Sequence, residues 1–345
     1  MASIYDIAKI AGVSAMTVSN VLNGRGRFSE ATRENVMRIA AEQGYFANAN
    51  AQSLRAKRTN TVGILTPDVS NAFFSTIVLE IESAMHDRGY SSFICSAAYD
   101  VERTDSYIQE LRRRNVDGLF IVGSMAPSSF ASVGRIPCAL VDYGLQDLPE
   151  QAIVIRNDFL ALCASQVACL TRSGCEHVAV VLANPEPRSE LGHALAGSFV
   201  AAAGRDPNVD ARTLRDLCEP EVVKFLENSK SESHLQSNEE AIAEFFEENP
   251  QIDGIAALGD RLALIACREA REHSRTPGRD LRIIGADNSN LSQIHSPAVS
   301  TVERNSLLMA RAAVGGMMAM FEGREPAERD VTIPHEVIER ETTLG

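Results

Sequence analysis

The amino-acid sequence predicts an α/β protein in which a small helical head precedes two units built on parallel sheets. Three observations lead to this prediction. The first sixty residues carry apolar side chains at helical spacing, interrupted by short glycine and asparagine breaks. From Thr61 onward, short continuous apolar runs alternate with helical patterns, which is typical of parallel sheets covered on both faces. Basic and acidic side chains are also divided unevenly between these two regions.

Length and composition exclude several classes of protein. The chain has 345 residues, enough for two or three domains, and its 45% hydrophobic and 23% charged residues are the mix of a globular protein. The longest apolar stretch, Ala312 to Phe321, is shorter than the roughly 20 residues that cross a bilayer. We see no secretion signal at the N-terminus and no framework spacing among the seven cysteines. The expectation is therefore a cytoplasmic protein with reduced thiols and no membrane association.

The head is expected to hold three helices. Apolar spacing predicts a helix over residues 4–11, and the glycine that follows suits a left-handed turn. Ser14 can cap a second helix, which Asn23-Gly24 would end. A third helix would begin after Ser29 and stop at Gly44. A helix, a tight glycine turn and a second helix form a helix-turn-helix arrangement, whose second helix enters the major groove of DNA.

Charge supports this interpretation of the head. The chain carries a net −13, yet residues 1–60 hold eight Lys and Arg against four Asp and Glu, so the head is +4 and the remainder −17. A basic head on an acidic body indicates a polyanion-binding domain attached to a separate globular domain. The second helix leaves several side chains outside its predicted core: Ala15, Met16, Thr17, Ser19 and Asn20. Short hydroxyl side chains beside a helix N-terminus suit phosphate, whereas a bundle that binds nothing is the less favoured alternative.

The body is predicted from its alternating runs. Seven apolar runs are expected to be strands: residues 62–65, 92–95, 118–122, 139–141, 178–182, 254–258 and 281–285. Helical patterns lie between them, over residues 73–88, 102–114, 159–172, 239–248 and 261–273. The series is long enough for two sheets with right-handed crossovers. Residues 204–238 have weak periodicity and are expected to form a loop without an assigned function.

Polar and aromatic residues follow several of these strands. In open parallel sheets, ligands bind beyond the carboxyl ends of the strands. Pro67 to Phe74, Asp142-Tyr143, Gly259-Asp260 and Asp287-Asn288 each follow a predicted strand. Carboxylates and aromatic rings gathered at one edge suit a small polar ligand with a flat face. Each of these residues alone is more often a loop cap or a surface charge, so the prediction depends on the group.

The segments IYDIAKIAGVSAMTVSNVLNG, NANAQSL and TVGILTPDVSNAFF occur in this order within the first 74 residues. Together they resemble the opening of a regulator of the LacI/GalR (lactose/galactose repressor) family, and a weaker resemblance continues to the C-terminus. The resemblance implies a helix-turn-helix DNA-binding domain over residues 1–47 and a hinge helix with linker over 48–60. Residues 61–345 would form a periplasmic-binding-protein-like (type I) core of two parallel-sheet α/β subdomains.

The resemblance also divides the core. The N-subdomain would take about 61–159 and 291–322, and the C-subdomain about 160–290 and 323–345. Six residues match positions that line the effector cleft: Phe73, Tyr143, Asn157, His193, Asp260 and Asp287. Several neighbouring residues depart from the family pattern: Arg156 and Gly259 replace the usual aspartate and asparagine, and His193 is nearest to the usual arginine. Two interpretations therefore stay open, a cleft that binds a sugar or related metabolite and an altered cleft controlled by a partner protein.

In the resembled family, the linker forms a hinge helix paired across a dimer in the minor groove. Seven residues cannot hold an isolated helix in water, so residues 48–54 should fold only against a partner copy and DNA. Leu54 would wedge between base pairs, although it is also a candidate for ordinary packing. Ala47 and Gln52 stand where the family usually has proline and often arginine. The implied DNA-binding residues are Tyr5, Ser14, Ala15, Met16, Thr17, Ser19, Asn20, Asn23, Asn48, Ala51, Gln52, Leu54 and Arg55.

The function implied is a sequence-specific transcriptional regulator, most simply a repressor. It would bind a pseudo-palindromic operator in double-stranded DNA as a homodimer or tetramer and answer to a small-molecule effector. No cofactor is expected, and no phosphate-binding glycine motif, zinc-protease motif or nucleophile elbow indicates an enzyme. Cys163 and Cys169 point to different sides of a predicted helix, so no metal site is expected with Cys175 and His177. An enzyme or a transport-type binding protein is the alternative from another class.

Overall fold

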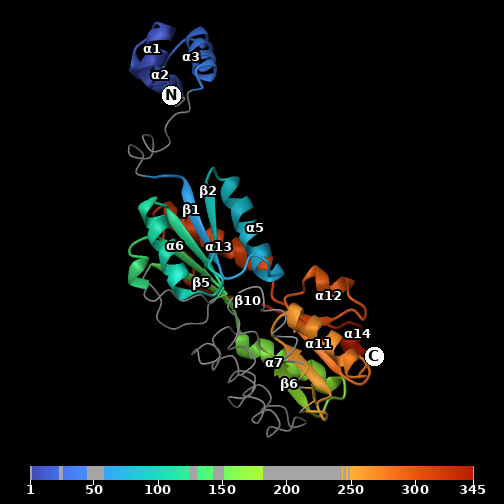
Figure 1. Cartoon of the computed structure of the whole chain (residues 1–345). Helices are drawn as coiled ribbons and strands as arrows, with labels where there is room; N and C mark the ends of the chain where they lie inside the picture. Colours follow the sequence, from blue (N-terminus) through green and yellow to red (C-terminus); the bar gives the residue numbers. More distant parts are fainter. Residues whose placement is uncertain are drawn as a thin grey trace. The chain divides into compact units, whose positions relative to one another are not determined.

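The structure is a computed structural model, and the part of the chain that it describes forms two separate units (Figure 1), Met1–Asn60 and Thr61–Gly345. It describes residues 2–22, 26–44, 58–123, 130–142, 151–181, 243, 246, 247 and 249–344. Eight expected site residues lie outside these ranges: Asn23, Asn48, Ala51, Gln52, Leu54, Arg55, Tyr143 and His193. The segment 204–238 and most of the predicted helix 239–248 also lie outside them.

The first unit contains three helices, α1 (Ile4–Ala11), α2 (Ala15–Leu22) and α3 (Glu30–Glu42). The predicted caps are confirmed, because the Ser14 hydroxyl accepts from the Thr17 amide at 3.1 Å and the Ser29 hydroxyl accepts from the Thr32 amide at 3.2 Å. Gly12 ends α1 in the left-handed conformation, at φ 69°. The helices enclose a small core, whose fully or nearly fully buried members are Ile7, Ala8, Val18, Val21, Val36, Ile39 and Ala40.

The first sheet of the second unit is parallel throughout, in the order β10-β5-β4-β3-β1-β2. Its strands are β1 (Thr61–Thr66), β2 (Ser91–Ser96), β3 (Gly118–Val122), β4 (Cys138–Val141), β5 (Ala152–Asn157) and β10 (Asp330–Ile333). Helices α5 (Ala72–His86) and α13 (Ser306–Phe321) pack on one face, and α6 (Val101–Arg113) packs on the other (Figure 1). A 3₁₀ turn, η1, spans Phe130–Ser132.

The second sheet has the order β11-β9-β8-β7-β6. Its strands are β6 (Val178–Val181), β7 (Gly254–Ala257), β8 (Arg282–Ala286), β9 (Ser300–Glu303) and β11 (Glu336–Ile338). Only β11 is antiparallel to its neighbour within the described strands. Helices α7 (Phe159–Arg172) and α11 (Asp260–Glu272) pack on the two faces, and the short helices α12 (Asn290–Ile294) and α14 (Glu341–Leu344) complete this lobe.

All seven predicted strands are present, but the sequence analysis missed β5, β9, β10 and β11. These pairings correct the expected division of the core. Residues 300–303 lie in the second sheet although 291–322 was assigned to the first subdomain, and residues 330–333 lie in the first sheet although 323–345 was assigned to the second. The reason is that β10 alternates exposed and half-buried residues and shows no apolar run, so only its pairing with β5 assigns it to a sheet.

Within the described residues, the chain passes three times between the two sheets. It crosses after β5 into α7, after β9 into α13, and between β10 and β11. The three crossings are the residues just after Asn157, Glu303 and Ile333. No described helix is long and apolar enough to span a bilayer.

Candidate functional site

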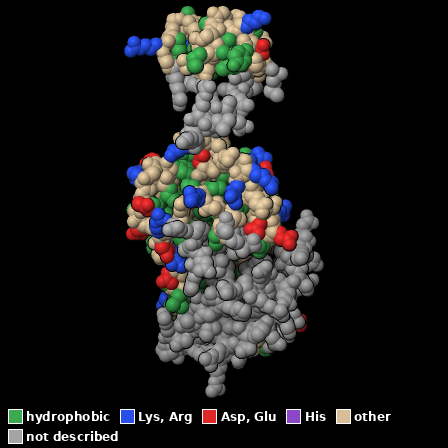
Figure 2. Space-filling view, turned by 90° about the vertical axis from the view of Figure 1, so that its left-hand side faces the viewer, with side chains coloured by type: hydrophobic (Ala, Val, Ile, Leu, Met, Phe, Trp, Pro, Cys, Tyr) green, Lys and Arg blue, Asp and Glu red, His purple; other side chains and the backbone are tan. Residues whose placement is uncertain are grey.

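The first unit presents the start of α2 at its surface. Ser14 is exposed, and its hydroxyl bonds to both the amide and the hydroxyl of Thr17, the latter at 2.9 Å. Met16 in the first turn of α2 and Tyr5 on α1 are 66% and 74% exposed, so two large side chains project from the surface of this unit. Figure 2 shows hydrophobic side chains on the visible face of this unit, with Lys and Arg side chains near its edge.

Ala15 differs from the sequence prediction. It was expected to lie outside the core, but it is half-buried and packs against the cluster formed by the three helices. Thr17, Ser19 and Asn20 are half-buried along the same helix.

Part of the positive charge of the first unit is paired within it. On α3, Arg38 lies 2.7 Å from Glu42 and Arg33 lies 3.8 Å from Glu30. These pairs are exposed, so each contributes little to stability, yet they reduce the charge that α3 offers to a polyanion. Helix α2 carries no charged residue, so its surface offers polar and apolar side chains to a partner instead of charge.

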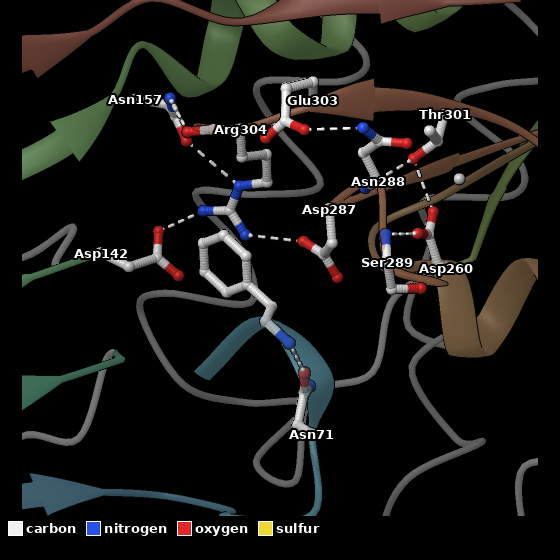
Figure 3. A network of polar contacts seen from close by, with 12 residues as sticks. Asn71, Asp142, Asn157, Asp260, Asp287, Asn288, Ser289, Thr301, Glu303 and Arg304 are labelled. Atoms are coloured by element: carbon white, nitrogen blue, oxygen red, sulfur yellow. Dashed lines mark hydrogen bonds and ion pairs between the residues drawn. The ribbon is translucent and has the colours of Figure 1, made fainter. Parts of the chain in front are cut away.

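In the second unit, three of the six expected effector residues, Phe73, Asn157 and Asp287, meet on Arg304, which the sequence analysis did not single out (Figure 3). Arg304 directly follows β9 and is only 8% exposed. Its guanidinium donates to the carboxylates of Asp142 and Asp287, the latter at 3.4 Å. Its central carbon lies 4.1 Å from the centroid of the Phe73 ring. This is the geometry of a cation–π contact combined with two charge-assisted hydrogen bonds.

The partners of Arg304 come from both lobes. Asp142 directly follows β4 of the first sheet, and Asp287 directly follows β8 of the second. Both residues have positive φ, 59° and 105°, so each turn is tight at the point where its carboxylate projects. Phe73 lies in the first turn of α5. The side-chain oxygen of Asn71, the N-cap residue of this helix, accepts a hydrogen bond from the Phe73 amide at 2.9 Å. A single guanidinium therefore joins the carboxyl ends of strands from two sheets.

Asn157 has a structural role where a ligand contact was expected. Its side-chain NH₂ donates to the backbone oxygens of Ile333, at 2.9 Å, and Arg304, at 3.2 Å. Its side-chain oxygen accepts from Nε of Arg304 at 3.1 Å. Because Asn157, Arg304 and Ile333 lie at the three crossings, this one buried amide holds all of them together. It also orients the guanidinium of Arg304.

Asp260 is likewise engaged inside the second lobe. It is 1% exposed, and its two oxygens accept from the Thr301 hydroxyl and the Ser289 amide, both at 2.6 Å. A Cβ on Gly285 would lie 2.5 Å from the Asp260 carboxylate, so glycine at this position makes room for it. Burial raises the pKa of Asp260, while these hydrogen bonds oppose the rise. Asp260 thereby braces the turn that carries Asp287.

Asp287 is the carboxylate with the strongest electrostatic perturbation at this site. Burial raises its pKa to about 8, Arg304 opposes the rise, and the negative charges of Asp260 and Asp142 add to it. The 3.4 Å contact with Arg304 therefore only partly compensates for the lost hydration. The neighbouring turn is rigid, since Asn288 donates to Glu303 at 2.7 Å and accepts from Arg340 at 2.5 Å.

A second ion pair joins the lobes at the same edge. Arg261 in the first turn of α11 lies 3.7 Å from Asp68, which follows β1. Tyr99, just beyond β2, faces the same charges: burial raises the pKa of its hydroxyl, with Asp68 adding to the rise and Arg261 opposing it. The rule that ligand sites lie after parallel strands could have identified Tyr99. Arg304 gave no such signal, because β9 was not predicted.

Among the described residues, five cysteines are buried and no group of side chains is arranged to bind a metal ion. The described cysteines Cys138, Cys163, Cys169, Cys175 and Cys267 are buried thiols, and burial raises their pKa values. Within the residues that the structure covers, no three His, Cys, Asp or Glu side chains are grouped so that they could hold a metal ion.

Comparison with known proteins assigns both units. Residues 3–48 match the family described as bacterial regulatory proteins, lacI family. Residues 167–343 match the periplasmic binding protein-like domain. Because the second match alone spans about half of the chain, the two matches together cover the head and the larger part of the core.

Relatives match over the full length. The HTH-type transcriptional regulator DegA of Bacillus subtilis (strain 168) is 28% identical, over 99% of this chain and 98% of its own. The ribose operon repressor of Halalkalibacterium halodurans is 27% identical, over 100% of this chain and 98% of its own. Among solved structures, the lac repressor dimer bound to operator and the anti-inducer ONPF has a TM-score of 0.78 at 23% identity, covering 100% of this chain and 99% of that one. At this identity the likeness shows the fold.

Proposed function

The chain belongs to the lacI family of bacterial regulatory proteins, and from this premise we propose that it is a repressor controlled by a small-molecule effector. It is a DNA-binding transcriptional regulator and not an enzyme. In the proposal, a homodimer binds a pseudo-palindromic operator, and the effector binds between the two lobes of each core. Since its target is the bacterial chromosome, its place of action is the cytoplasm.

The DNA-binding half of the proposal rests on α2. Ser14 caps this helix, and the exposed Met16 lies in its first turn, where a recognition helix reaches base edges and phosphates. Ser19 and Asn20 lie further along the helix. We expect Tyr5 on α1 to contact the DNA backbone, because its side chain is 74% exposed. Residues 48–54 would add a hinge helix that folds on the operator, with Leu54 as its wedge.

The dimer is supported by an apolar surface of the first lobe. Leu79 on α5 is 62% exposed, and Leu308 on the adjacent α13 is 44% exposed. Phe93 and Ile94 are exposed on β2, which is the edge strand of the first sheet. Exposed apolar groups on neighbouring elements and an unpaired strand edge are typical of an interface between protein chains. A second copy of this chain is the occupant that a two-fold operator requires.

The effector half rests on one observation, the meeting of Asp142, Asp287 and Phe73 on Arg304 between the two lobes. A ligand that changes these contacts changes the relative free energies of two lobe arrangements. It thereby shifts the population that binds the operator, and operator and effector affinities become reciprocally linked. Relatives with the names ribose operon repressor and CelR, the latter in complex with cellobiose, support a small metabolite as the effector class.

The decisive experiment is selection of the full-length protein on random duplexes. We expect an enriched pseudo-palindrome whose half-sites are related by a two-fold axis. Met16→Glu should abolish enrichment, because a carboxylate in the first turn of α2 would face phosphates. Met37→Glu is the matched control, since Met37 is also exposed, at 50%, but lies on α3. Absence of any enriched sequence, or equal binding by both variants, would contradict the proposal.

A further inference from the structure

The face of the Phe73 ring in the core is already occupied by a side chain of the protein. The guanidinium of Arg304 lies over it at 4.1 Å and is held between the carboxylates of Asp142 and Asp287. These three side chains, Phe73, Asp142 and Asp287, are termed the cation seat. The seat is well shielded, because the side chains of Asp142 and Asp287 are only 18% and 10% exposed.

Charge restricts what can replace Arg304. A neutral molecule stacked on Phe73 would displace the guanidinium and leave the shielded carboxylate of Asp142 without a cation, which is unfavourable. An anionic molecule directed at Arg304 would meet the same two carboxylates and be repelled. A flat cation conserves the charge of the seat, because it restores both charge-assisted hydrogen bonds and the contact with the ring.

Among the described residues, the other arginines near the seat are already bound to partners. Arg261 is paired with Asp68 at 3.7 Å, and Arg340 is bonded to Asn288 at 2.5 Å. Glu303 lies close by and is bonded to Asn288 and to the amide of Asn305. The described side chains around the seat therefore contribute an excess of carboxylates, which attracts a positively charged ligand.

We propose that the effector carries a guanidinium or amidinium group, which replaces Arg304 in the cation seat. This inference rests on the proposed function, of which it specifies the ligand class. Arg304 is then a specificity-determining residue, because its side chain already fills the seat and excludes neutral sugars. It also lowers the apparent affinity for every ligand that must displace it.

Displacement would act directly on the connection between the lobes. Arg304 lies on the second crossing, and its Nε is bonded to Asn157, which holds the other two crossings. When a ligand guanidinium takes its place, the bridge between Asp142 of the first lobe and Asp287 of the second is no longer attached to the second crossing. The same exchange that admits the ligand thus releases a contact that favours one lobe arrangement.

The test compares two probes of the same shape, propylguanidinium and the neutral propylurea, by calorimetry on the full-length protein. Arg304→Ala vacates the seat and should bind propylguanidinium at least tenfold more tightly than propylurea, and at least tenfold more tightly than the wild type does. Adding Asp142→Asn and Asp287→Asn to this variant should remove the preference. Arg324→Ala, which removes an exposed arginine paired with Glu322, should behave as the wild type.

Two results would overturn the inference. One is equal binding of propylguanidinium and propylurea by Arg304→Ala, and the other is micromolar binding of ribose or cellobiose that Arg304→Ala leaves unchanged. If Arg304→Ala does not fold without a ligand, it is refolded in the presence of each probe. Recovery of folded protein with propylguanidinium but not with propylurea supports the cation seat. Failure to refold with either probe contradicts it. Operator binding without a probe is measured separately, so failure of the repressor proposal is recognised independently.

Discussion

At the scale of single residues, the burial of Asp287 makes the folded protein less stable when this carboxyl group ionises. Its pKa is raised to about 8 in the folded protein, whereas the unfolded carboxyl ionises in the ordinary acidic range. Between these values unfolding releases a proton, so this carboxyl stabilises the fold at low pH and the contribution is lost as the pH rises to about 8. The groups that face it are Arg304, Asp260 and Asp142.

We therefore expect the Tm of the wild type minus the Tm of Asp287→Asn to be largest at pH 5. It should fall as the pH rises to 8 and then level off. Thermal unfolding of the core, followed by circular dichroism from pH 5 to 9, measures it. A difference that does not change with pH, or that grows toward pH 8, would show that Asp287 is ionised throughout.

Asn20 supports a second prediction at this scale. It is half-buried on α2, and its amide lies close to Gly26, since a Cβ on Gly26 would approach it at 3.4 Å. Asparagine pairs with the N6 and N7 atoms of adenine, whereas arginine pairs with O6 and N7 of guanine. The Asn20→Arg variant should therefore select guanine at one position of each half-site. This preference over the other bases is worth roughly 1–3 kcal/mol. Identical selected sequences for both proteins would show that position 20 reads no base.

At the scale of elements, the three crossings depend on one amide. Asn157→Ala removes the donors to Arg304 and Ile333 and leaves their carbonyl oxygens in a buried setting. We expect the free energy of unfolding of the core, measured in urea, to fall by roughly 2–3 kcal/mol, because buried polar groups are left without hydrogen-bond partners. Gln151→Ala, an exposed amide just before the same strand, is the matched control and should change the free energy of unfolding by less than about 0.5 kcal/mol. Equal effects would refute the assigned role of Asn157.

At the scale of the whole molecule, assembly and DNA binding should be separable. The double variant Leu79→Glu, Leu308→Glu carries charges on the apolar surface of α5 and α13. Light scattering should therefore show a monomer. Its affinity for the full operator should fall more than tenfold, because the two heads then bind independently, while affinity for one half-site stays constant. Val101→Glu, on the opposite face of the sheet, is the control and should remain dimeric. A dimer in the double variant would place the interface elsewhere.

Much of the fold was predictable because its signals are local. The caps at Ser14 and Ser29 and the seven apolar strands each lie within a few residues of the pattern that predicts them. The strands β9, β10 and β11 have only three or four residues each and no continuous apolar run, so they appear only when partner strands are in place. The error in the subdomain boundaries follows from two of them, β9 and β10.

The helix-turn-helix head, the two-sheet α/β core and the placement of Asp142 and Asp287 after buried strands could all be predicted from the residues alone, because hydrophobic periodicity and capping act over short distances. What these carboxylates contact depends on the folded arrangement of the chain. Arg304 is 162 residues from Asp142 and 147 from Asn157, and no local pattern connects positions so far apart. Their contact arises because the chain crosses between the sheets three times, and the crossings bring a cation, two carboxylates and an aromatic ring to one point.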